Sequence, residues 1–529
     1  MKAIFTLVVL VPVFSIAQLA KPFTSTFDEK KIQHHVETLA SDSFQGRKPF
    51  TIGETKTIDY LTTQLRSIGL EPGNRNSYIQ EVTTIRSTYA SPDIIVQSAR
   101  GDFKLLYIKD YAIKADGEDT LISLQKIPVV FVGYGIVAPE YNRNDYAGID
   151  VKGKIVLVLA DDVEQEQSFL DKGKALTKYE TIKYKHEEAV RQGALSCFLI
   201  PPPIESRIFE TIQQSMSREI LINSPPDNLT CSVRGVISRE ALIKLFNASG
   251  LDSSMLIQAR NSNFKPLAMN LSFSTSIDVK SKYRKSANLV SKIAGSDHAD
   301  ETIIYCAHWD HLGIGIPDAE GDSIYNGAND NALGVSVVLE LARGFKALKP
   351  LPSRSIVFIF FTLEETGMLG SIWYTRNPIY PLQKTVAVIN VDGFNRYGRS
   401  KNIELNGPGN STLEDDLEKK VKDLGRYITP GDPDERLYYR SDQISFARAG
   451  IPALFISRGI DYLEGGTDYE KIVREKYYGY HTPNDEFNEG WRFDGTIEDM
   501  EILYNLGKEL ANNRVWPQWK SGSEFKSNR

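Results

Sequence analysis

The sequence predicts an α/β protein built on a mixed, mostly parallel sheet flanked by helices. From about residue 268 onward, short apolar runs alternate with amphipathic segments, as strands and helices do when helices cover both faces of a sheet. The run SIVFIFF at 355–361 is apolar throughout, which is typical of a strand buried on both faces. Residues 106–265 differ, because their short β-rich runs are separated by glycine and proline. We therefore expect a second, β-rich unit there.

Each element is expected from its local pattern of apolar and polar residues. Residues 28–69 should form two helices around the polar loop SFQGRKPF, with Gly69 as the stop signal. In the β-rich unit we expect strands within 126–141, 151–162 and 195–201 and helices at 178–194 and 238–250. In the last region we expect strands at 269–279, 286–295, 301–308, 355–365, 385–394 and 451–459 and helices at 331–348, 367–377, 412–425 and 496–513.

Length and composition limit the class of protein. A chain of 529 residues exceeds the usual size of one compact domain, so two or more units are expected. Hydrophobic residues make up 41% of the chain and charged residues 25%, which is ordinary for a soluble globular protein. The formal net charge of -6 argues against nucleic acid and anionic membranes as partners. The oligomeric state stays open.

The first residues predict export. MKAIFTLVVLVPVFSIA has one lysine, an apolar run and small residues at Ser15 and Ala17, which is the pattern of a secretory signal peptide cleaved after Ala17. A membrane anchor is the less favoured alternative, because the apolar run is shorter than the roughly 20 residues that a spanning helix needs. We expect a secreted or periplasmic protein with no membrane span after signal removal. The expected division is 1–17 (signal peptide), 18–105, 106–265 and 266–529.

The three cysteines do not form a recognisable framework. Cys197 and Cys306 lie in apolar runs and are expected to be buried small hydrophobic residues. Export would permit a disulfide between Cys197 and Cys231, and the sequence leaves that pairing open. None of the three has the spacing of a zinc–thiolate site.

Polar residues that could carry chemistry follow the predicted strands of the last region or open its helices. In open α/β sheets, functional sites form at the carboxyl ends of the strands. AHWDHLG follows one strand, NGANDNA precedes a helix, and LEE and VDGF end two further strands, while YHTPNDE is a later loop. The residues in question are His308, Asp310, Asp330, Glu364, Glu365, Asp392 and His481.

A site built from these residues would suit metal ions. Imidazole and carboxylate ligands without thiolate favour Zn²⁺, or Mn²⁺ or Co²⁺ by similar arguments. Five ligands exceed the roughly three that a catalytic zinc keeps, so they suit two ions if one carboxylate bridges them. Asp330, in a tight glycine-bearing turn, is the best bridge. The five candidate ligands are His308, Asp330, Glu365, Asp392 and His481.

Two further acids receive roles beside the ligands. A turn at the strand end could bring Glu364 to the same site as Glu365, where it would be free to act as general base. Asp310 suits an acid that orients the imidazole of His308. His311 is left out of the ligand set, as a structural or pocket-lining residue. Taken singly, each cluster also fits a polar strand end, a solvated surface or an Asx turn.

The ordered motifs AHWDHLG, NGANDNA, LEETG, NVDGF and YHTPND resemble those of the co-catalytic zinc aminopeptidase family commonly called M28. LASDSFQGRKPFTIGE resembles the family's N-terminal segment, and VFVGYGIVAPEYNRNDYAGIDVKGKIVLVL resembles the protease-associated (PA) domain often inserted in these enzymes. The resemblance implies a zinc-peptidase fold with a PA domain at 106–265 and the catalytic domain at 266–529. It also implies roles: one zinc on His308, Asp330 and Asp392, a second on Asp330, Glu365 and His481, Glu364 as general base and Asp310 as the orienting acid.

The resemblance implies an exported aminopeptidase in which a metal-bound hydroxide attacks the first carbonyl of a peptide. One departure is Gln443 in YYRSDQISF, where the family usually has histidine, so substrate selectivity does not carry over. Alternatives on the same fold are carboxypeptidase or dipeptidase action and glutaminyl cyclisation. Arg440, Arg448 and Arg458 are candidates for the basic pocket that a carboxypeptidase needs. A non-catalytic binding module is a further alternative.

Overall fold

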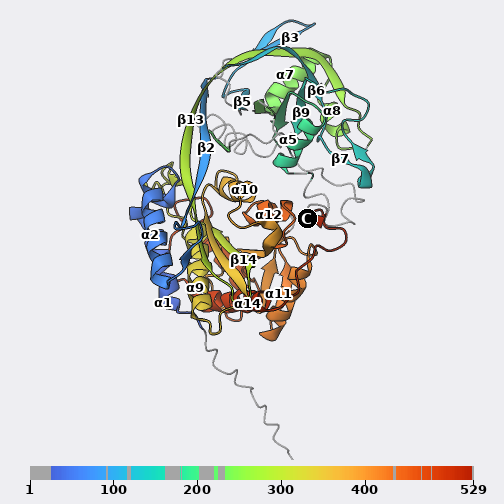
Figure 1. Cartoon of the computed structure of the whole chain (residues 1–529). Helices are drawn as coiled ribbons and strands as arrows, with labels where there is room; N and C mark the ends of the chain where they lie inside the picture. Colours follow the sequence, from blue (N-terminus) through green and yellow to red (C-terminus); the bar gives the residue numbers. More distant parts are fainter. Residues whose placement is uncertain are drawn as a thin grey trace, which may run out of the picture.

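The computed structural model describes residues 26–90, 93–115, 121–160, 179, 181–201, 220–223, 231, 233–261, 263–432, 437–465, 468–477 and 479–526. The expected signal peptide lies outside these residues. Figure 1 shows two lobes joined by two long strands, β2 (Ile79–Ala90) and β13 (Leu267–Ile293). Among the described residues, no helix combines the length and apolar character needed to cross a membrane.

The sheet of the first lobe is mixed and parallel at its centre. β14 (His298–His308) lies between β17 and β18 and runs parallel to both. The end of β13 pairs antiparallel with β17 at one side, and β21 continues the parallel part at the other. The remaining strands are β17 (Arg354–Phe361), β18 (Thr385–Asn390), β21 (Ala453–Ser457), β19 (Asn402–Leu405) and β20 (Tyr427–Pro430). This sheet confirms the predicted fold class.

Helices cover both faces of this sheet. On one face, Tyr305 of β14 belongs to a core shared with α1, α2, α9, α11 and α14. On the other face, Ile304 packs in a separate core with Tyr374 of α10 and Phe446 of α12. The helices are α1 (Glu29–Leu39), α2 (Ile52–Ile68), α9 (Gly334–Ala347), α10 (Leu369–Arg376), α11 (Thr412–Asp423), α12 (Gln443–Arg448) and α14 (Phe493–Asn512).

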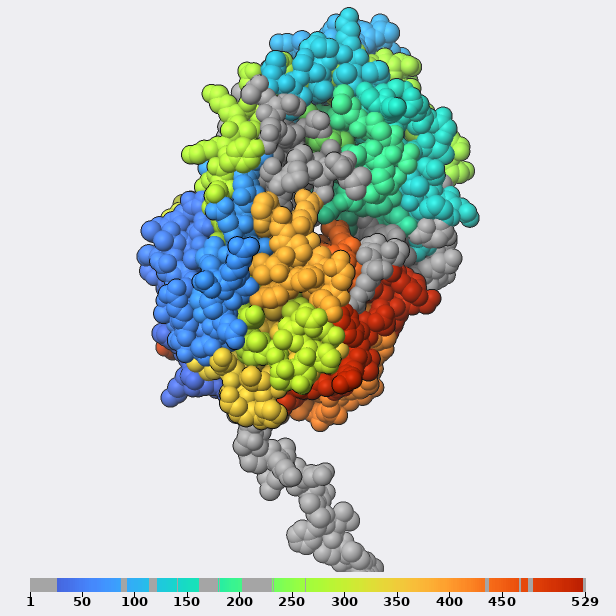
Figure 2. All heavy atoms as spheres, in the orientation of Figure 1, coloured from blue at the N-terminus to red at the C-terminus, as the bar shows by residue number. Residues whose placement is uncertain are grey.

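The two N-terminal helices occupy the predicted positions. Asp28 caps α1 by accepting from the N–H of Lys30, and Gly69 ends α2 with a φ of 78°, which suits glycine. Between them, residues 42–47 form a 3₁₀ turn. Figure 2 shows this N-terminal segment (blue) as part of the surface of the first lobe, next to segments from much later in the chain.

The second lobe is β-rich and has its own hydrophobic core, which runs from Ile94 to Val279. Its centre is four strands that pair in parallel, β6, β9, β10 and β12. The helix α7 (Arg239–Ser249) begins where Ser238 accepts from the N–H of Ala241. The other bounds are β3 (Ile94–Ser98), β4 (Phe103–Leu105), β5 (Tyr111–Ala115), β6 (Leu121–Phe131), β9 (Ile155–Leu159), β10 (Ser196–Ile200), β11 (Ile220–Asn223), β12 (Val233–Ile237), α5 (Ile182–Arg191) and α8 (Ser254–Gln258).

One expectation about the strands is corrected. Segments 269–279 and 286–295 were expected as separate strands, and the polar run KSKYRK lies between them. In the structure they are a single strand of 27 residues, β13. The polar run pairs antiparallel with β2, which pairs with β11 at its other edge, and residues 280–283 of β13 are exposed. Polar composition there reflects exposure and does not mark a turn.

Candidate metal centre

Parallel strands bring the predicted residues to one edge of the sheet. His308 is the last residue of β14, while Glu364 and Asp392 follow β17 and β18 by three and two residues. Because these strands are parallel, their carboxyl ends lie side by side. Asp330 reaches the same place from the turn before α9, and His481 from the loop after α13 (Tyr469–Tyr477). The structure thus brings all five candidate ligands together.

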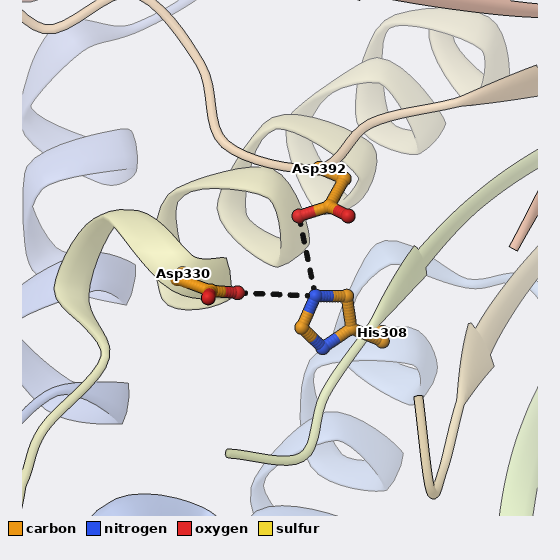
Figure 3. Close-up of side chains that lie close together, drawn as sticks. All are labelled: His308, Asp330 and Asp392. Carbon is orange, nitrogen blue, oxygen red and sulfur yellow. Dashed lines mark hydrogen bonds and ion pairs between the residues drawn. The ribbon is translucent and has the colours of Figure 1, made fainter. Parts of the chain in front are cut away.

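The first cluster is centred on His308. Its Nε2 lies 3.2 Å from Oδ1 of Asp330 and 3.3 Å from Oδ1 of Asp392 (Figure 3). Its Nδ1 lies 3.1 Å from the main-chain oxygen of Asp310 and 3.9 Å from the carboxylate. The expected orienting contact therefore comes from the main chain of Asp310. Its carboxylate instead accepts from the N–H of Glu364 at 3.0 Å.

The second cluster uses the other oxygen of Asp330. Nε2 of His481 lies 3.2 Å from Oδ2 of Asp330 and 3.0 Å from Oε2 of Glu365. The two oxygens of Asp330 therefore face two different histidines. This is the arrangement expected of a carboxylate that bridges two ions.

The distances fit divalent cations. Two ligand atoms held at about 2.0–2.1 Å by one tetrahedral ion lie about 3.3 Å apart. The four contacts of His308 and His481 with their carboxylates span 3.0 to 3.3 Å. The buried Nε2 of His481 makes no hydrogen bond despite these neighbours. The donor set and its geometry therefore fit ions such as zinc.

His311, which the sequence reasoning left out, lies in the second cluster. It is buried, and its Nδ1 is 2.6 Å from Oε1 of Glu365 and 4.0 Å from Oδ2 of Asp330. Its ligand atoms are close enough to those of Asp330 and Glu365 to share an ion. The 2.6 Å contact is a hydrogen bond, so we assign His311 to orienting Glu365. The signal was present in the sequence, since His311 follows His308 by three residues in one loop.

Glu364 lies beside the first cluster. Leu363, with a φ of 58°, adopts a left-handed conformation directly after β17 and starts a turn. Two N–H groups of that turn, from Gly367 and Met368, donate to the main-chain oxygen of Glu364. The turn lets two adjacent acids reach one site, as expected: Glu364 lines the cavity, and Glu365 contacts the histidines.

The carboxylates perturb one another strongly. Burial raises the pKa of Glu364 well above its usual range, and the nearby charges of Asp392, Asp442 and Glu365 raise it further against the effect of His308. Burial also raises the pKa of Asp310 to about 8. For Asp330 burial acts in the same direction, but the nearby imidazoles of His308, His481 and His311 outweigh it and hold the pKa well below its usual range. So many acids in one buried place require positive charge nearby.

A cavity of about 380 Å³ opens beside the carboxylates. Its wall combines aromatic side chains with three arginines, Arg396, Arg440 and Arg458, of which sequence reasoning missed the first. Arg458 donates to both oxygens of Glu470 at 2.7 and 2.8 Å, so its charge is matched. Arg448 and Gln443 are not among the residues that line this cavity. Gln443 is buried and bonds to Asn390 and Tyr438.

Comparisons with known proteins agree with this geometry. Residues 288–502 match the model of Peptidase family M28. "Aminopeptidase NAALADL1" of Mus musculus is 27% identical over 249 residues, which is 46% of this chain and 28% of that protein. "Aminopeptidase YwaD" of Bacillus subtilis (strain 168) is 24% identical over 515 residues, which is 93% of this chain and 88% of that protein. The chain thus spans about a quarter of the length of the first relative and most of the second.

The fold has a counterpart among solved structures. "Aminopeptidase from Aneurinibacillus sp. strain AM-1" superposes with a TM-score of 0.51 at 17% identity, covering 93% of this chain and 95% of that one. This likeness supports the mixed α/β fold. Residues 288–502 of this chain match the domain of Peptidase family M28. All five candidate ligands and Glu364 lie inside this range.

Proposed function

We propose that this protein is an exported aminopeptidase that removes N-terminal residues from peptides at a centre of two zinc ions. The observation that carries the proposal is the position of Asp330, whose two oxygens each lie 3.2 Å from the Nε2 atom of a different histidine. The match to Peptidase family M28 and the names of the aminopeptidase relatives support the activity. Export rests on the predicted signal peptide at residues 1–17.

The ligand sets follow the two clusters. His308, Asp330 and Asp392 would hold one zinc ion, and Asp330, Glu365 and His481 the other. His311 would fix the orientation of Glu365 through its hydrogen bond. When bound, such a pair of ions supplies Lewis acidity toward the peptide carbonyl and toward water.

Glu364 would carry out the proton transfers of the reaction, and Asp310 would position it. Glu364 lines the cavity next to Asp392, within reach of a water that attacks there. It would accept a proton from that water and return it to the leaving amine. Asp310 holds the N–H of Glu364 and so fixes the place from which this carboxylate acts. The acidic wall of the cavity would attract the free α-ammonium group of the substrate.

We also propose that the second lobe is a PA domain that acts as a recognition surface or a shield for the site. Support comes from its β-rich composition, its separate core and the resemblance of the segment that begins at Val130. Whether it recognises substrates or only shields the site is tested by peptides of increasing length. A rise in kcat/KM with length would indicate contacts beyond the first lobe.

Turnover on a panel of aminoacyl arylamides tests the activity, with each substrate measured beside its N-acetylated form. The protein is assayed loaded with zinc and again after chelation. We expect cleavage of the free-amine forms only, lost on chelation and restored by zinc. Binding of two zinc equivalents without cleavage would refute the aminopeptidase assignment and point to carboxypeptidase, dipeptidase or cyclase substrates. The pairing of Arg458 with Glu470 weighs against a free basic pocket for a substrate carboxylate.

A further inference from the structure

Asn326 and Gly327, which lead into the turn that carries Asp330, have no regular secondary structure, and within that turn (Ala328–Leu333) Asp330 and Asn331 have non-helical φ and ψ angles. Asn326, Ala328 and Asp330 are 2%, 0% and 6% exposed. Buried main-chain N–H and C=O groups need hydrogen-bond partners, and here a helix or sheet cannot provide all of them. Two charged side chains, from opposite ends of the sequence, provide them instead.

Arg47 satisfies the carbonyl groups of this loop. The guanidinium is fully buried, and each of its five N–H groups can donate once. Three of its bonds go to the oxygens of Asn326, Gly327 and Asp330, at 2.5, 2.8 and 3.3 Å. A fourth reaches the oxygen of Trp309 at 3.0 Å, directly after His308, and the fifth reaches α1 at 2.9 Å. Arg47 therefore connects both ligand-bearing loops.

Asp485 satisfies the N–H groups of the same loop. Its Oδ1 accepts from Asn329 at 3.0 Å and its Oδ2 from Asp330 at 2.9 Å. Its main-chain oxygen accepts from Ala328 at 2.8 Å. Asp485 is itself buried and lies four residues after His481. A shift of the Asp330 loop would therefore also disturb the segment that carries His481.

Gly46 allows the main chain to bring Arg47 to the Asp330 loop. Gly46 has a φ of 62°, and a Cβ atom there would lie 2.4 Å from the oxygen of Tyr325 and 2.8 Å from Cα of Gly313. Both contacts are with main-chain atoms, which cannot turn aside. The main chain at position 46 can therefore lie this close to Tyr325 and Gly313 only with glycine. The next residue, Arg47, then reaches the loop that carries Asp330.

We propose that Arg47 and Asp485 are positioning residues that hold the Asp330 loop in its metal-binding shape, Arg47 through the carbonyl groups and Asp485 through the N–H groups. This inference rests on the proposed metal centre. The hydrogen bonds described above join both side chains to main-chain atoms, so both act through the main chain. Arg47 also lies outside residues 288–502, so the site depends on a segment that the family match does not include.

The charge of Arg47 adds to its hydrogen bonds. Burial lowers its pKa to about 10, while the nearby carboxylates of Asp330, Asp485, Asp310 and Glu365 act in the opposite direction. The group therefore stays positive at neutral pH. Its charge lies under a cluster of acids that repel one another, and it reduces that repulsion.

The test compares Arg47→Lys with a matched control, Arg354→Lys, in the full chain. Both changes keep the positive charge and remove the planar fork of donors. Arg354 is also a buried arginine of the first lobe, bonded to Glu301 at 2.6 Å and to the oxygen of Leu510 at 2.6 Å. It opens β17 at the end of the strand away from Glu364. The readouts are amide hydrogen exchange of 326–333 in metal-free protein, the zinc Kd by chelator competition, and the urea midpoint.

We expect Arg47→Lys to speed exchange of 326–333 and to raise the zinc Kd roughly 10- to 100-fold, as loss of groups that orient ligands does. Arg354→Lys should lower the urea midpoint and leave the exchange of that segment and the zinc Kd unchanged. Wild-type exchange in Arg47→Lys would overturn the inference, and so would equal effects of the control variant. Faster exchange with an unchanged zinc Kd would overturn the metal-holding role.

A second variant keeps the test decisive if Arg47→Lys does not fold. Asp485→Asn retains the shape but replaces one acceptor by a donor, so exchange at Asn329 and Asp330 should speed up and the zinc Kd should rise. Unchanged values would overturn the inference. Zinc binding by wild type without aminopeptidase turnover would refute only the proposed function, while a wild type that binds no zinc would overturn both.

Discussion

Both lobes contain parallel strands whose carboxyl ends meet at one edge, yet only one gathers chemistry there. In the first lobe, Asp310 and His311 follow β14, Glu364 and Glu365 follow β17, and Asp392 follows β18, each within four residues of the strand end. At the same spacing in the second lobe, the sequence has Asp161 and Asp162 after β9 and Glu240 after β12, but no histidine within four residues of the ends of β9, β10 or β12. Within the described residues, the compatible groups of metal-ligating side chains all lie in the first lobe. Parallel strands bring the residues after their carboxyl ends together, and the side chains at those positions determine whether a metal site can form there.

Both lobes bury charged side chains. Arg143 of the second lobe pairs with Asp145, two residues away, at 2.9 Å. Arg426 of the first lobe pairs at 2.6 Å with Asp499, from a distant helix. The five N–H groups of Arg47 all donate to main-chain oxygens. Buried charge ties distant segments together in both lobes, since Arg143 also donates to the oxygen of Ala259 at 3.2 Å and the buried Asp110 pairs with Lys244 at 2.8 Å.

The largest effect should come from Asp330→Ala, which removes the atom pair shared by the two clusters. We expect loss of both zinc equivalents and of turnover, measured by metal analysis of the dialysed protein and by arylamide hydrolysis. The exposed Asp300 near the start of β14, replaced by alanine, serves as the surface control and should keep both zinc equivalents. Retention of two zinc ions by Asp330→Ala would contradict the bridging role.

Glu364→Gln should separate chemistry from metal binding. The amide keeps the shape and the main-chain bond to Asp310 but cannot accept the proton, so kcat should fall roughly 10²- to 10⁴-fold. Zinc stoichiometry should stay at two, because Glu364 belongs to neither ligand set. Steady-state kinetics and metal analysis on one preparation check both. Turnover near that of wild type with two zinc ions bound would remove Glu364 from the mechanism.

In the second lobe, Arg143→Met should cost stability without affecting metal. Removal of one partner leaves the buried Asp145 carboxylate uncompensated, at roughly 3–5 kcal/mol. Hydrogen exchange in β9 and β10 should rise and the urea midpoint should fall, while the zinc Kd stays unchanged. A weaker zinc affinity would show that the lobes are coupled more tightly than their separate cores suggest.

The smallest effect concerns pH. Burial raises the pKa of Asp499 to about 6, against the opposing effect of Arg426. Because this folded value exceeds the unfolded one of about 3.9, the stability contribution of Asp499 is full below pH 4 and is lost as pH rises through 6. The free energy of unfolding of wild type, relative to Asp499→Asn, should therefore fall by about 2 kcal/mol between pH 4 and 7 in urea titrations. A difference that is constant with pH would contradict the shifted pKa.

The sequence predicted most of the site because its signals are local. Each of the five candidate ligands lies next to a strand end or a loop motif, and parallel pairing of the strands does the rest. His311 was set aside because a second histidine in one loop is more often structural, and only the structure shows its bond to Glu365. Arg47 could not have been found this way, since its partners lie more than 260 residues later in the chain, apart from Leu39.

The fold was predictable in class but not in one continuous element. Apolar periodicity located β14, β17, β18 and β21 but not β2, β19 and β20, and the glycine signal located the end of α2. Periodicity fails for β13, because its middle is exposed on both faces and is stabilised by pairing with β2. Long-range pairing of this kind leaves no mark in local composition.

That strand has a mechanical consequence. All 12 residues of β2 pair with β13, so the lobes are joined by a stiff ribbon and not by a slack tether. Any change in their relative orientation must appear as twist spread along the ribbon. The far end of β13 pairs with β17, from Leu289 opposite Phe360 to Ile293 opposite Ile356. A rotation of the second lobe would therefore be transmitted through β13 to β17, the strand that ends just before Glu364 and Glu365.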